Sequence, residues 1–346
     1  MRVLRTLQAI TVAALALALG ACSAPPATDS GQENTEGAKL PSATIGLTYI
    51  PNVQFSPFYM AEDQGFFIAE GAQVKLRHHG QNEGLFTALV GGEEDAVVAF
   101  GDEMAQAMMQ DPSLELVAIA QVYAQYPVEI IVNSALGATT IQDLKGKTIG
   151  LPGRFGSSWF GLQAALAQAG MTLEDVNIAE IGYTQQAQMA SNQVDAVVGF
   201  VNNDSVRFKL AGMDVTTIPL APNTPLVAAD LVTTKAFAQK NPDAVRAMAK
   251  GSVKGIEAVI ADPNKALEVT KKYDPTLATE ESLKAATEIL AATVKVLTPS
   301  EGKKVGEQDL DTWTDMLGFL KTLPGAFENE PATLDVKTLV TNEYLS

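Results

Sequence analysis

The sequence predicts an α/β fold made of two lobes, each a sheet flanked by helices. Short apolar, strand-like runs alternate with helix-like segments from residue 44 to about residue 234, which is typical of α/β sheets. The run Asp95 to Phe100, Asp-Ala-Val-Val-Ala-Phe, recurs as Asp-Ala-Val-Val-Gly-Phe at Asp195 to Phe200, and each copy leads into a polar turn. Two lobes that each present a strand end to a shared cleft would explain the repeat. Chance is the alternative, because short apolar strands look alike.

Residues 1–21 are predicted to be removed rather than folded. Arg2 and Arg5 precede an apolar run from Ala9 to Leu19 that is too short to span a bilayer. The run ends in Leu-Gly-Ala-Cys22, which resembles the lipobox of bacterial lipoprotein signal peptides and implies cleavage before a lipid-modified Cys22. We therefore expect a protein that is lipid-anchored on the extracytoplasmic face of the cell membrane. Cys22 is the only cysteine, so the sequence excludes a disulfide and a cysteine-based metal site.

Residues 22–42 predict a flexible tether, because Ala, Pro, Thr, Ser, Gly, Gln and Glu leave little to bury. The remainder is long enough for two domains, with residues 43–132 and 225–346 expected in lobe 1 and residues 133–224 in lobe 2. The net charge is −16 without a basic cluster, which argues against a nucleic-acid partner.

The first expected strand ends at Pro51 and Asn52, because proline lacks a hydrogen-bond donor and asparagine favours turns. A helix should follow, with Ser56 as its cap, Pro57 in its first turn and Gly65 at its exit. The loop between them therefore lies at the carboxyl end of a strand, where ligands bind in open α/β sheets.

This loop carries an amide pair, Asn52 and Gln54, beside three rings, Phe55, Phe58 and Tyr59. Amides and rings together suit a flat heterocycle with hydrogen-bonding edges better than a bare ion. Phe58 and Tyr59 can equally be core residues of an amphipathic helix.

The remaining elements follow from apolar periodicity and turn residues. Strands are expected at 72–77, 96–100, 116–122 and 128–132, with a helix at 83–90. The segments 147–161 and 177–185 read as strand-to-loop transitions, and the first of them feeds a helix at 157–169. Residues 228–234 return the chain to the first lobe, and helices follow at 242–260, 263–273, 280–296 and 309–320.

Catalytic motifs of the common hydrolase, phosphate-binding and zinc-protease types are absent from the sequence. His78 and His79 are adjacent, so on a strand they point to opposite faces, and we expect them at a solvent-facing strand end rather than in a metal site. Asp102, Glu103 and Asp204 could act as acids or bases, but carboxylates after strands more often cap the next helix. We expect no enzymatic activity, no cofactor and no metal.

The candidate loops share rings and amides, and they hold nearly half of the aromatic residues of the chain. The rings are Phe55, Phe58, Tyr59, Tyr123, Tyr126, Phe155, Trp159, Phe160, Tyr183 and Phe200. The amides are Asn52, Gln54, Gln125, Gln185, Asn202 and Asn203. Some rings, with Phe160 and Phe200 as the foremost candidates, belong to an ordinary core. Arg154 is the only cation in the set, so the inventory fits a neutral or weakly charged aromatic heterocycle.

With these residues in view, the chain resembles bacterial solute-binding lipoproteins of ABC importers, in the branch related to thiamine-pyrimidine and nitrate/sulfonate binding proteins. The resemblance rests on Tyr49-Ile-Pro-Asn-Val-Gln-Phe-Ser-Pro-Phe-Tyr-Met-Ala61, Gly101-Asp-Glu103, Leu144-Lys-Gly-Lys-Thr-Ile-Gly150, Gly153-Arg-Phe-Gly156 and Val194-Asp-Ala-Val197. The Pro-Asn-Val-Gln-Phe form is most similar to the riboflavin-uptake subgroup. The resemblance implies a type 2 periplasmic-binding-protein-like fold, a riboflavin-like ligand between closing lobes, and delivery to an ABC permease with its ATPase. We expect a monomer.

Transferred position by position, the resemblance implies ligand contacts from Asn52, Gln54, Phe55, Tyr59, Arg154, Ser157, Trp159, Asn202 and Asn203. The strand-end argument adds Asp102, Tyr123, Tyr126, Phe155, Gln185 and Asp204. Asp204-Ser205 departs from the Glu-Pro that the resemblance leads us to expect after the paired asparagines. We expect Trp159 to stack on the ligand, so that its loss weakens binding with little effect on the fold.

Other functions remain open at this point. A receptor for a thiamine pyrimidine precursor fits the same residues, whereas a nitrate or sulfonate receptor would need more cations than Arg154. The eukaryotic pyrimidine-precursor synthase resembles the same fold, but this chain lacks the cysteines of that enzyme.

Overall fold

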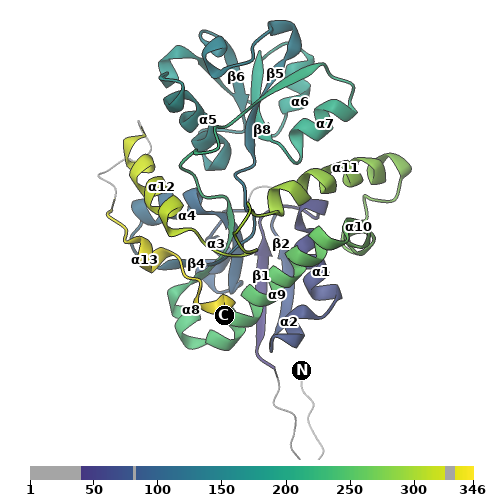
Figure 1. The fold of residues 1–346 in the computed structure, drawn as a ribbon, viewed down its shortest axis with the longest axis vertical. Coiled ribbons are helices and arrows are strands. Elements are labelled where there is room, and N and C mark those ends of the chain that lie inside the picture. The colour runs from purple at the N-terminus through teal and green to yellow at the C-terminus, as the bar shows by residue number, and fades with distance from the viewer. Residues whose placement is uncertain (1–39, 81–82, 324–331) are drawn as a thin grey trace, which may run out of the picture. The chain divides into compact units, whose positions relative to one another are not determined.

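Two five-stranded sheets, each covered by helices on both faces, form the part of the chain that the computed structural model describes, residues 40–80, 83–323 and 332–346 (Figure 1). Both sheets belong to one unit that spans Leu40–Ser346. The predicted signal peptide, Cys22 and nearly all of the predicted tether lie outside the described residues. Ser42, the last residue of the predicted tether, already begins the first strand.

The first sheet has the strand order β2-β1-β3-β10-β4. β1 pairs in parallel with β2 and β3, and β10 runs antiparallel to both β3 and β4. The return of the chain to the first sheet through β10 confirms the prediction for residues 228–234. The strands are β1 Ser42–Leu47, β2 Gln73–His78, β3 Ala96–Phe100, β4 Leu116–Gln121 and β10 Ala229–Thr234.

The second sheet repeats this arrangement as β7-β6-β8-β5-β9. β5 pairs antiparallel with both β8 and β9, so residues 128–132 belong to the second sheet, and the expected lobe boundary after residue 132 was misplaced. The error arose because β4 and β5 are both buried apolar strands, and only pairing distinguishes their sheets. The strands are β5 Val128–Asn133, β6 Thr148–Leu151, β7 Asn177–Glu180, β8 Ala196–Phe200 and β9 Val215–Pro219.

The repeated Asp-Ala-Val-Val-x-Phe run occupies equivalent positions in the two sheets. One carboxylate oxygen of Asp95 accepts from the Thr44 amide at 2.8 Å, and Asp195 accepts from Thr148 at the same distance. At the other end, the amides of Gly101 and Val201 donate to Ala228 and Pro127, at 3.0 and 2.8 Å. The two copies of the run are therefore structurally equivalent.

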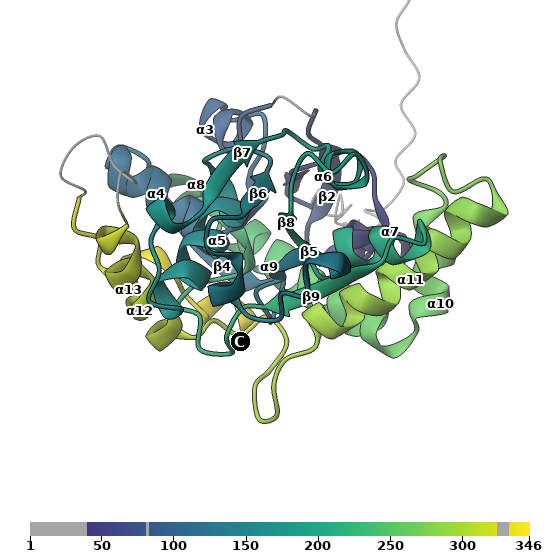
Figure 2. The same cartoon turned by 90° about the horizontal axis from the view of Figure 1, so that it is seen from above.

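The helices cover both faces of the first sheet because its central strands alternate their side chains between two cores. Ala96 and Val98 of β3 face α1 and α9, whereas Val97 and Ala99 face α4 and α12 (Figures 1 and 2). The helices are α1 Ser56–Asp63, α2 Phe66–Ala69, α3 Thr87–Gly91, α4 Gly101–Gln110, α5 Gly156–Gln168, α6 Gln185–Ala190, α7 Asp204–Leu210, α8 Lys235–Lys240, α9 Pro242–Ala261, α10 Pro263–Thr270, α11 Glu280–Leu297, α12 Leu310–Thr322 and α13 Val336–Leu339. Short 3-10 turns span Val53–Phe55, Ser134–Leu136, Ile141–Leu144, Leu173–Asp175 and Glu343–Leu345.

Two local predictions were wrong. Ser56 does not cap α1, because the 3-10 turn at Val53–Phe55 precedes the helix and is itself capped by the side chain of Asn52. The helix expected at 83–90 is shortened to α3, which begins only after Gly84, a residue with poor helix propensity. Gly65 does end α1, with the left-handed φ of +69° that such an exit requires. Within the described ranges, no helix is both long and apolar enough to cross a membrane.

Candidate functional site

The carboxyl ends of β3 and β8 face each other between the two sheets. The rings of Phe100 and Phe200, the last residues of these strands, meet edge to face with centroids 5.8 Å apart. The strand tips therefore converge as the repeat predicted. Because these two rings already touch, a flat ligand could lie between them only after the lobes separate.

The segment that joins β4 to β5 passes beside these tips and contributes two tyrosines. The Tyr126 hydroxyl lies within hydrogen-bonding distance of the Asp102 carboxylate and, at 2.9 Å, of the Ser157 carbonyl oxygen. The Phe100 ring packs edge to face with Tyr123 and with Tyr126, with centroids 6.4 and 5.7 Å apart. Tyr126 thus connects the start of α4 on one sheet with the start of α5 on the other.

Asn202 reaches from the tip of β8 to the first lobe. Its side-chain nitrogen donates to the Thr293 hydroxyl on α11 at 3.1 Å and lies 3.4 Å from the Tyr123 hydroxyl. Asn202 is fully buried, and its side-chain oxygen has no hydrogen-bond partner in the described part of the chain. Burial raises the pKa of Tyr123 to about 12, so the phenol remains protonated at neutral pH.

Asp102 occupies the equivalent position at the tip of β3 and is also fully buried. One of its oxygens contacts Tyr126, and the other finds no partner among the residues described. Glu103 accepts from the Phe100 amide at 3.1 Å and from the backbone N–H of Ser157, which lies in the first turn of α5. Burial raises the pKa of both carboxyls, and for Asp102 the neighbouring Glu103 raises it further.

Asp230 of β10 is a third buried carboxyl close to this tip. It accepts from the Gln308 amide at 2.9 Å, and its second oxygen has no partner within the described ranges. Burial raises the pKa of Asp230 well above its usual range. The folded protein therefore disfavours the ionised carboxylate, and this penalty disappears as the pH falls through the raised pKa towards that of the unfolded chain.

We expect Asp230→Asn to raise the Tm at about pH 8 and to raise it less at about pH 5. The asparagine keeps the oxygen that Gln308 binds but carries no charge to bury. Thermal unfolding of both proteins at the two pH values measures this difference. A Tm change that is the same at both pH values would contradict the assignment.

The first loop and the end of β2 form a hydrogen-bonded chain. The Tyr59 hydroxyl lies 2.9 Å from Nε2 of His78, and Nδ1 of His78 lies 2.8 Å from the Tyr49 carbonyl oxygen. Since a carbonyl only accepts, Nδ1 carries the proton and Tyr59 donates to Nε2. Burial lowers the pKa of His78, which favours this neutral form. The Phe55 ring meets the imidazole edge to face at 5.5 Å.

The expectation of two solvent-facing histidines was wrong. His79 is buried, and its Nε2 lies 2.9 Å from the carboxylate of Glu94, which Arg77 also binds at 2.7 Å. The absence of a side chain at Gly46 makes room for this carboxylate, because a Cβ there would lie 2.2 Å from it. Adjacency in sequence could not show that a glutamate fifteen residues later reaches the same place.

Tyr59, a predicted ligand contact, lies in the first core. It is fully buried and stacks on Tyr273, with centroids 4.3 Å apart and an interplanar angle of 8°. The alternative interpretation of Tyr59 and Phe58 as core residues is therefore the one that their burial supports.

Three of the four candidates around the glycine turn before α5 lie in different surroundings. Trp159 is only 6% exposed and lies in the second core, while the Arg154 guanidinium sits 5.4 Å above its ring and pairs with Glu180. Phe155 is exposed. Because Trp159 is a buried ring, we now expect its removal to destabilise the fold as well.

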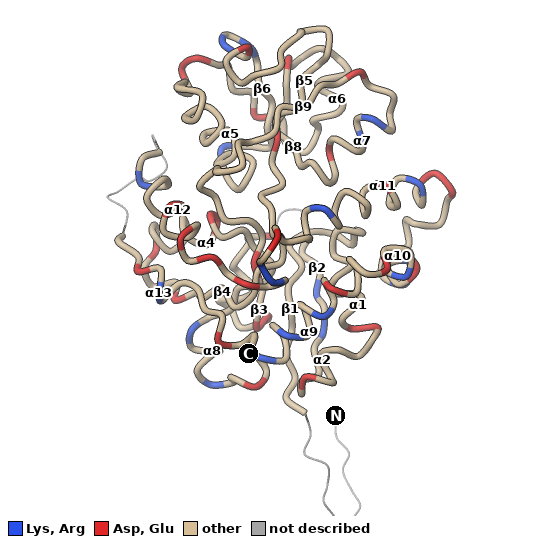
Figure 3. The backbone as a smooth tube through the Cα atoms, in the orientation of Figure 1, with Lys and Arg blue, Asp and Glu red and all other residues tan. Residues whose placement is uncertain are grey.

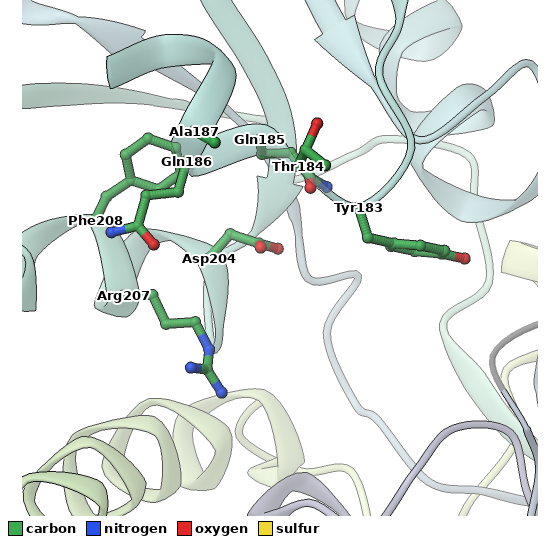
Figure 4. Close-up of a pocket in the computed structure, with 8 residues that line it drawn as sticks. All are labelled: Tyr183, Thr184, Gln185, Gln186, Ala187, Asp204, Arg207 and Phe208. Atoms are coloured by element: carbon green, nitrogen blue, oxygen red, sulfur yellow. The ribbon is translucent and has the colours of Figure 1, made fainter. Parts of the chain in front are cut away.

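A cavity of about 320 Å³ lies beside the tip of β8, between α6 and α7 (Figure 4). It contains two predicted residues, Gln185 and Asp204, and Asn203 lies next to it, accepting from Arg207 at 2.9 Å. The sequence analysis named Tyr183, Gln185 and Asp204, but it missed the other five lining residues because they belong to no motif. The cavity is lined by Tyr183, Thr184, Gln185, Gln186, Ala187, Asp204, Arg207 and Phe208.

The structure thus brings together candidates from both sheets around the strand tips. Gln54 joins this group through a hydrogen bond to Tyr123, and the Asn52 side chain holds the loop by accepting from the Gln54 amide at 3.0 Å. Figure 3 shows Lys and Arg interspersed with Asp and Glu over the drawn residues of both lobes. Across the described chain, no three potential metal ligands of the His, Cys, Asp or Glu type form a group.

Comparison with known proteins places this geometry in a family. The family model described as NMT1/THI5 like matches residues 52–266. The riboflavin-binding protein RibY of Chloroflexus aurantiacus is 29% identical over 340 residues, which cover 95% of each chain. A formylaminopyrimidine-binding protein of Halalkalibacterium halodurans is 23% identical over 299 residues, 84% of this chain and 88% of the relative.

Solved structures agree on the fold. The aliphatic sulphonate binding protein SsuA of Escherichia coli superposes with a TM-score of 0.66 at 14% identity, covering 85% of this chain and 94% of that protein. The desulfurization enzyme DSZB superposes with a TM-score of 0.57 at 14% identity, covering 88% and 97%. The fold is thus the two-lobed α/β fold of periplasmic binding proteins, as predicted. Because the family model covers more than half of the sequence, the chain belongs to the NMT1/THI5-like family.

Proposed function

We propose that the chain is an extracytoplasmic solute-binding lipoprotein of an ABC importer that binds a planar aromatic heterocycle, with riboflavin as the first choice. Cys22 would carry the lipid, and a membrane permease with its ATPase would receive the ligand. The observation that carries the proposal is the pair of opposed strand tips, where Asp102 and Asn202 are fully buried and each has an oxygen without a partner in the described chain. Buried polar groups usually find partners, so such atoms mark places where a ligand can bind.

The two lobes supply a mechanism for capture. A ligand closes two lobes only if it binds the closed form more tightly, which requires contacts to both. Phe55 and Gln54 from one side and Asn202 and Asn203 from the other can provide mixed ring and amide contacts. Links from Asn202 to Thr293 and from Glu103 to Ser157 hold the two lobes together here, and the proposal requires that these links form again when the lobes close over a ligand.

Riboflavin as first choice rests on the similarity to RibY over nearly the whole chain. Titration of the purified protein with riboflavin, followed by the quenching of flavin fluorescence and by the Tm, tests it. Formylaminopyrimidine and an alkanesulfonate serve as competitors in the same assay. Riboflavin should give the largest Tm increase, and a larger increase with either competitor would replace it as the ligand.

The formylaminopyrimidine receptor is the second candidate, because one relative carries that name and the amides of the loop fit a pyrimidine edge. The fold also occurs in DSZB, an enzyme, so the fold does not decide between binding and catalysis. Recovery of the bound ligand unchanged after incubation, checked by mass spectrometry, distinguishes a receptor from an enzyme.

We expect Thr293→Val to weaken riboflavin binding by about fivefold, which corresponds to the roughly 1 kcal/mol of one hydrogen bond. The valine removes the acceptor for Asn202 in the closed form and keeps the shape of the side chain. Calorimetric titration of the variant measures the change.

Thr270→Val is the matched control for this variant. Thr270 and Thr293 are both fully buried, and both donate to the carbonyl four residues earlier at 2.8 Å, but only Thr293 also accepts from the other lobe. The control should lose a similar amount of stability and no affinity. Equal affinities in the two variants would remove the Asn202 link from the mechanism of closure.

A further inference from the structure

The cavity between α6 and α7 differs in character from the aromatic tips beside it. Its walls come from the second lobe alone: the loop after β7, the first turn of α6 and the length of α7 (Figure 4). Rings contribute only at two places, Tyr183 and Phe208, and the other side chains are mostly amide, hydroxyl, carboxylate and guanidinium groups. The cavity therefore offers hydrogen-bonding groups beside an apolar wall.

Asp204 and the neighbouring amides provide the hydrogen-bonding groups of this cavity. One oxygen of Asp204 accepts from the Phe200 amide at 2.8 Å, and Figure 4 shows the carboxylate directed into the space below Gln185. The Gln185 side chain is buried and Gln186 is exposed, and both residues line the cavity. A carboxylate accepts from hydroxyl groups, and amides both donate to them and accept from them, so neighbouring hydroxyls match this set.

The charge of the lining argues against an anionic group. Asp204 and Arg207 carry opposite formal charges. Nε of Arg207 donates to Asn203 at 2.9 Å, and Figure 4 shows the guanidinium extending away from the Asp204 carboxylate. A phosphate in the cavity would bring a negative charge next to the Asp204 carboxylate, which is unfavourable in a partly buried site. Uncharged hydroxyls avoid this repulsion.

The cavity lies close to where rings of the two lobes approach each other. Tyr183 on its rim is 64% exposed, and its ring centroid lies 6.3 Å from that of Tyr49 in the first lobe. On the other side, Asp204 holds the backbone of Phe200, whose ring contacts Phe100. A ligand ring bound between the lobes near these residues could extend a short substituent into the cavity.

We propose that this cavity binds a flexible chain of hydroxyl groups attached to the aromatic ring of the ligand, with Asp204, Gln185 and Gln186 hydrogen-bonding to the hydroxyls. This inference rests on the proposed function, because it needs a ring ligand between the lobes. It adds that the second lobe selects for the uncharged polyol part of the ligand and against its phosphorylated form.

Three flavins separate the contributions of ring, chain and phosphate. Lumiflavin has the riboflavin ring system with a methyl group in place of the ribityl chain, and riboflavin 5′-phosphate adds a phosphate to that chain. The wild-type protein should bind riboflavin at least about tenfold more tightly than either, since two or more hydrogen bonds of the chain are lost in one case and opposed by charge in the other. Riboflavin and lumiflavin binding with equal affinity would overturn the proposal.

Variants locate the effect in the cavity. Asp204→Asn keeps an oxygen for the Phe200 amide and should weaken riboflavin binding about fivefold or more while leaving lumiflavin binding unchanged. Gln186→Ala, at an exposed position that the fold does not need, should act in the same direction. Asp311→Asn, an exposed acid in the first turn of α12, is the control and should change neither affinity.

The outcomes distinguish this inference from the proposed function. Equal weakening of riboflavin and lumiflavin in both cavity variants would mean that they disturb the ring site, and it would overturn the polyol assignment while leaving flavin binding intact. Binding of no flavin to the wild-type protein would remove riboflavin as the ligand and this inference with it.

Discussion

Trp313→Ala is expected to lower the free energy of unfolding by about 3–5 kcal/mol, the usual loss for truncating a fully buried aromatic residue. The indole of Trp313 on α12 is 1% exposed and lies under the tip of β3, where a Cβ on Gly101 would be 3.1 Å from it. Its N–H donates to Gln308 at 3.0 Å, and Gln308 in turn donates to Asp230 at 2.9 Å. The alanine leaves a cavity and also removes the donor that Gln308 needs. Urea unfolding monitored by circular dichroism measures the loss.

Trp313→Phe separates packing from hydrogen bonding in this prediction. The phenyl ring restores most of the volume but not the N–H, so about 1–3 kcal/mol should remain as the cost of the unsatisfied Gln308 oxygen and imperfect packing. If Trp313→Ala lowered the free energy of unfolding less than Trp313→Phe, Trp313 would not support the tip of β3.

Gly255→Ala is expected to destabilise the protein by about 3 kcal/mol, at the upper end of the range for overpacking. Gly255 lies where α9 crosses α1, and a Cβ there would approach the Pro57 carbonyl oxygen to 2.0 Å and the Ala61 Cβ to 3.0 Å. The first contact is with backbone, so the helices must separate rather than a side chain rotate. Because α1 follows directly on the Asn52 loop, the shift should also weaken riboflavin binding.

Gly318→Ala is the matched control for the helix effect of the substitution. Gly318 is an exposed glycine within α12, and a Cβ there would meet nothing within 4 Å. The alanine should stabilise by about 0.5–1 kcal/mol, because glycine is a poor helix former. Opposite signs for the two glycines in the same urea experiment are expected. A stabilising Gly255→Ala would refute the close approach of α9 and α1.

Most strands and long helices were predicted to within a few residues, because their apolar runs end at residues with a clear local effect. β3 ends just before the polar turn at Gly101, and β8 ends just before the turn that holds the paired asparagines. α9 begins at Pro242, because proline fits the first turn of a helix. The assignment of β5 to a sheet failed, since apolar strands carry no local sign of their partners. The prediction for Ser56 failed for a related reason. The Asn52 side chain caps the preceding turn, and the Ser56 hydroxyl is buried without a partner among the described residues.

The candidate site was predictable where it sits at strand ends and obscure where it depends on long-range packing. Asp102 and Asn202 come just after β3 and β8, and Tyr126 lies in the segment between β4 and β5, so sequence position was enough to place them near the tips. Tyr59 and Trp159 were chosen as rings, yet burial against Tyr273 and under Arg154 depends on contacts with other elements. The cavity residues Gln186 and Arg207 have no local signal, because only the packing of α6 beside α7 makes them neighbours.

The position of β5 determines how the protein can be divided into fragments for separate expression. A fragment that starts after residue 133 would lack the strand between β8 and β9, leaving two open edges that invite association with other chains. A fragment of residues 127–222 retains all five strands of its sheet. The other half cannot be made as one uninterrupted piece. β10 lies between β3 and β4 in its sheet but follows residues 127–222 in the sequence, so a short linker would have to replace those residues.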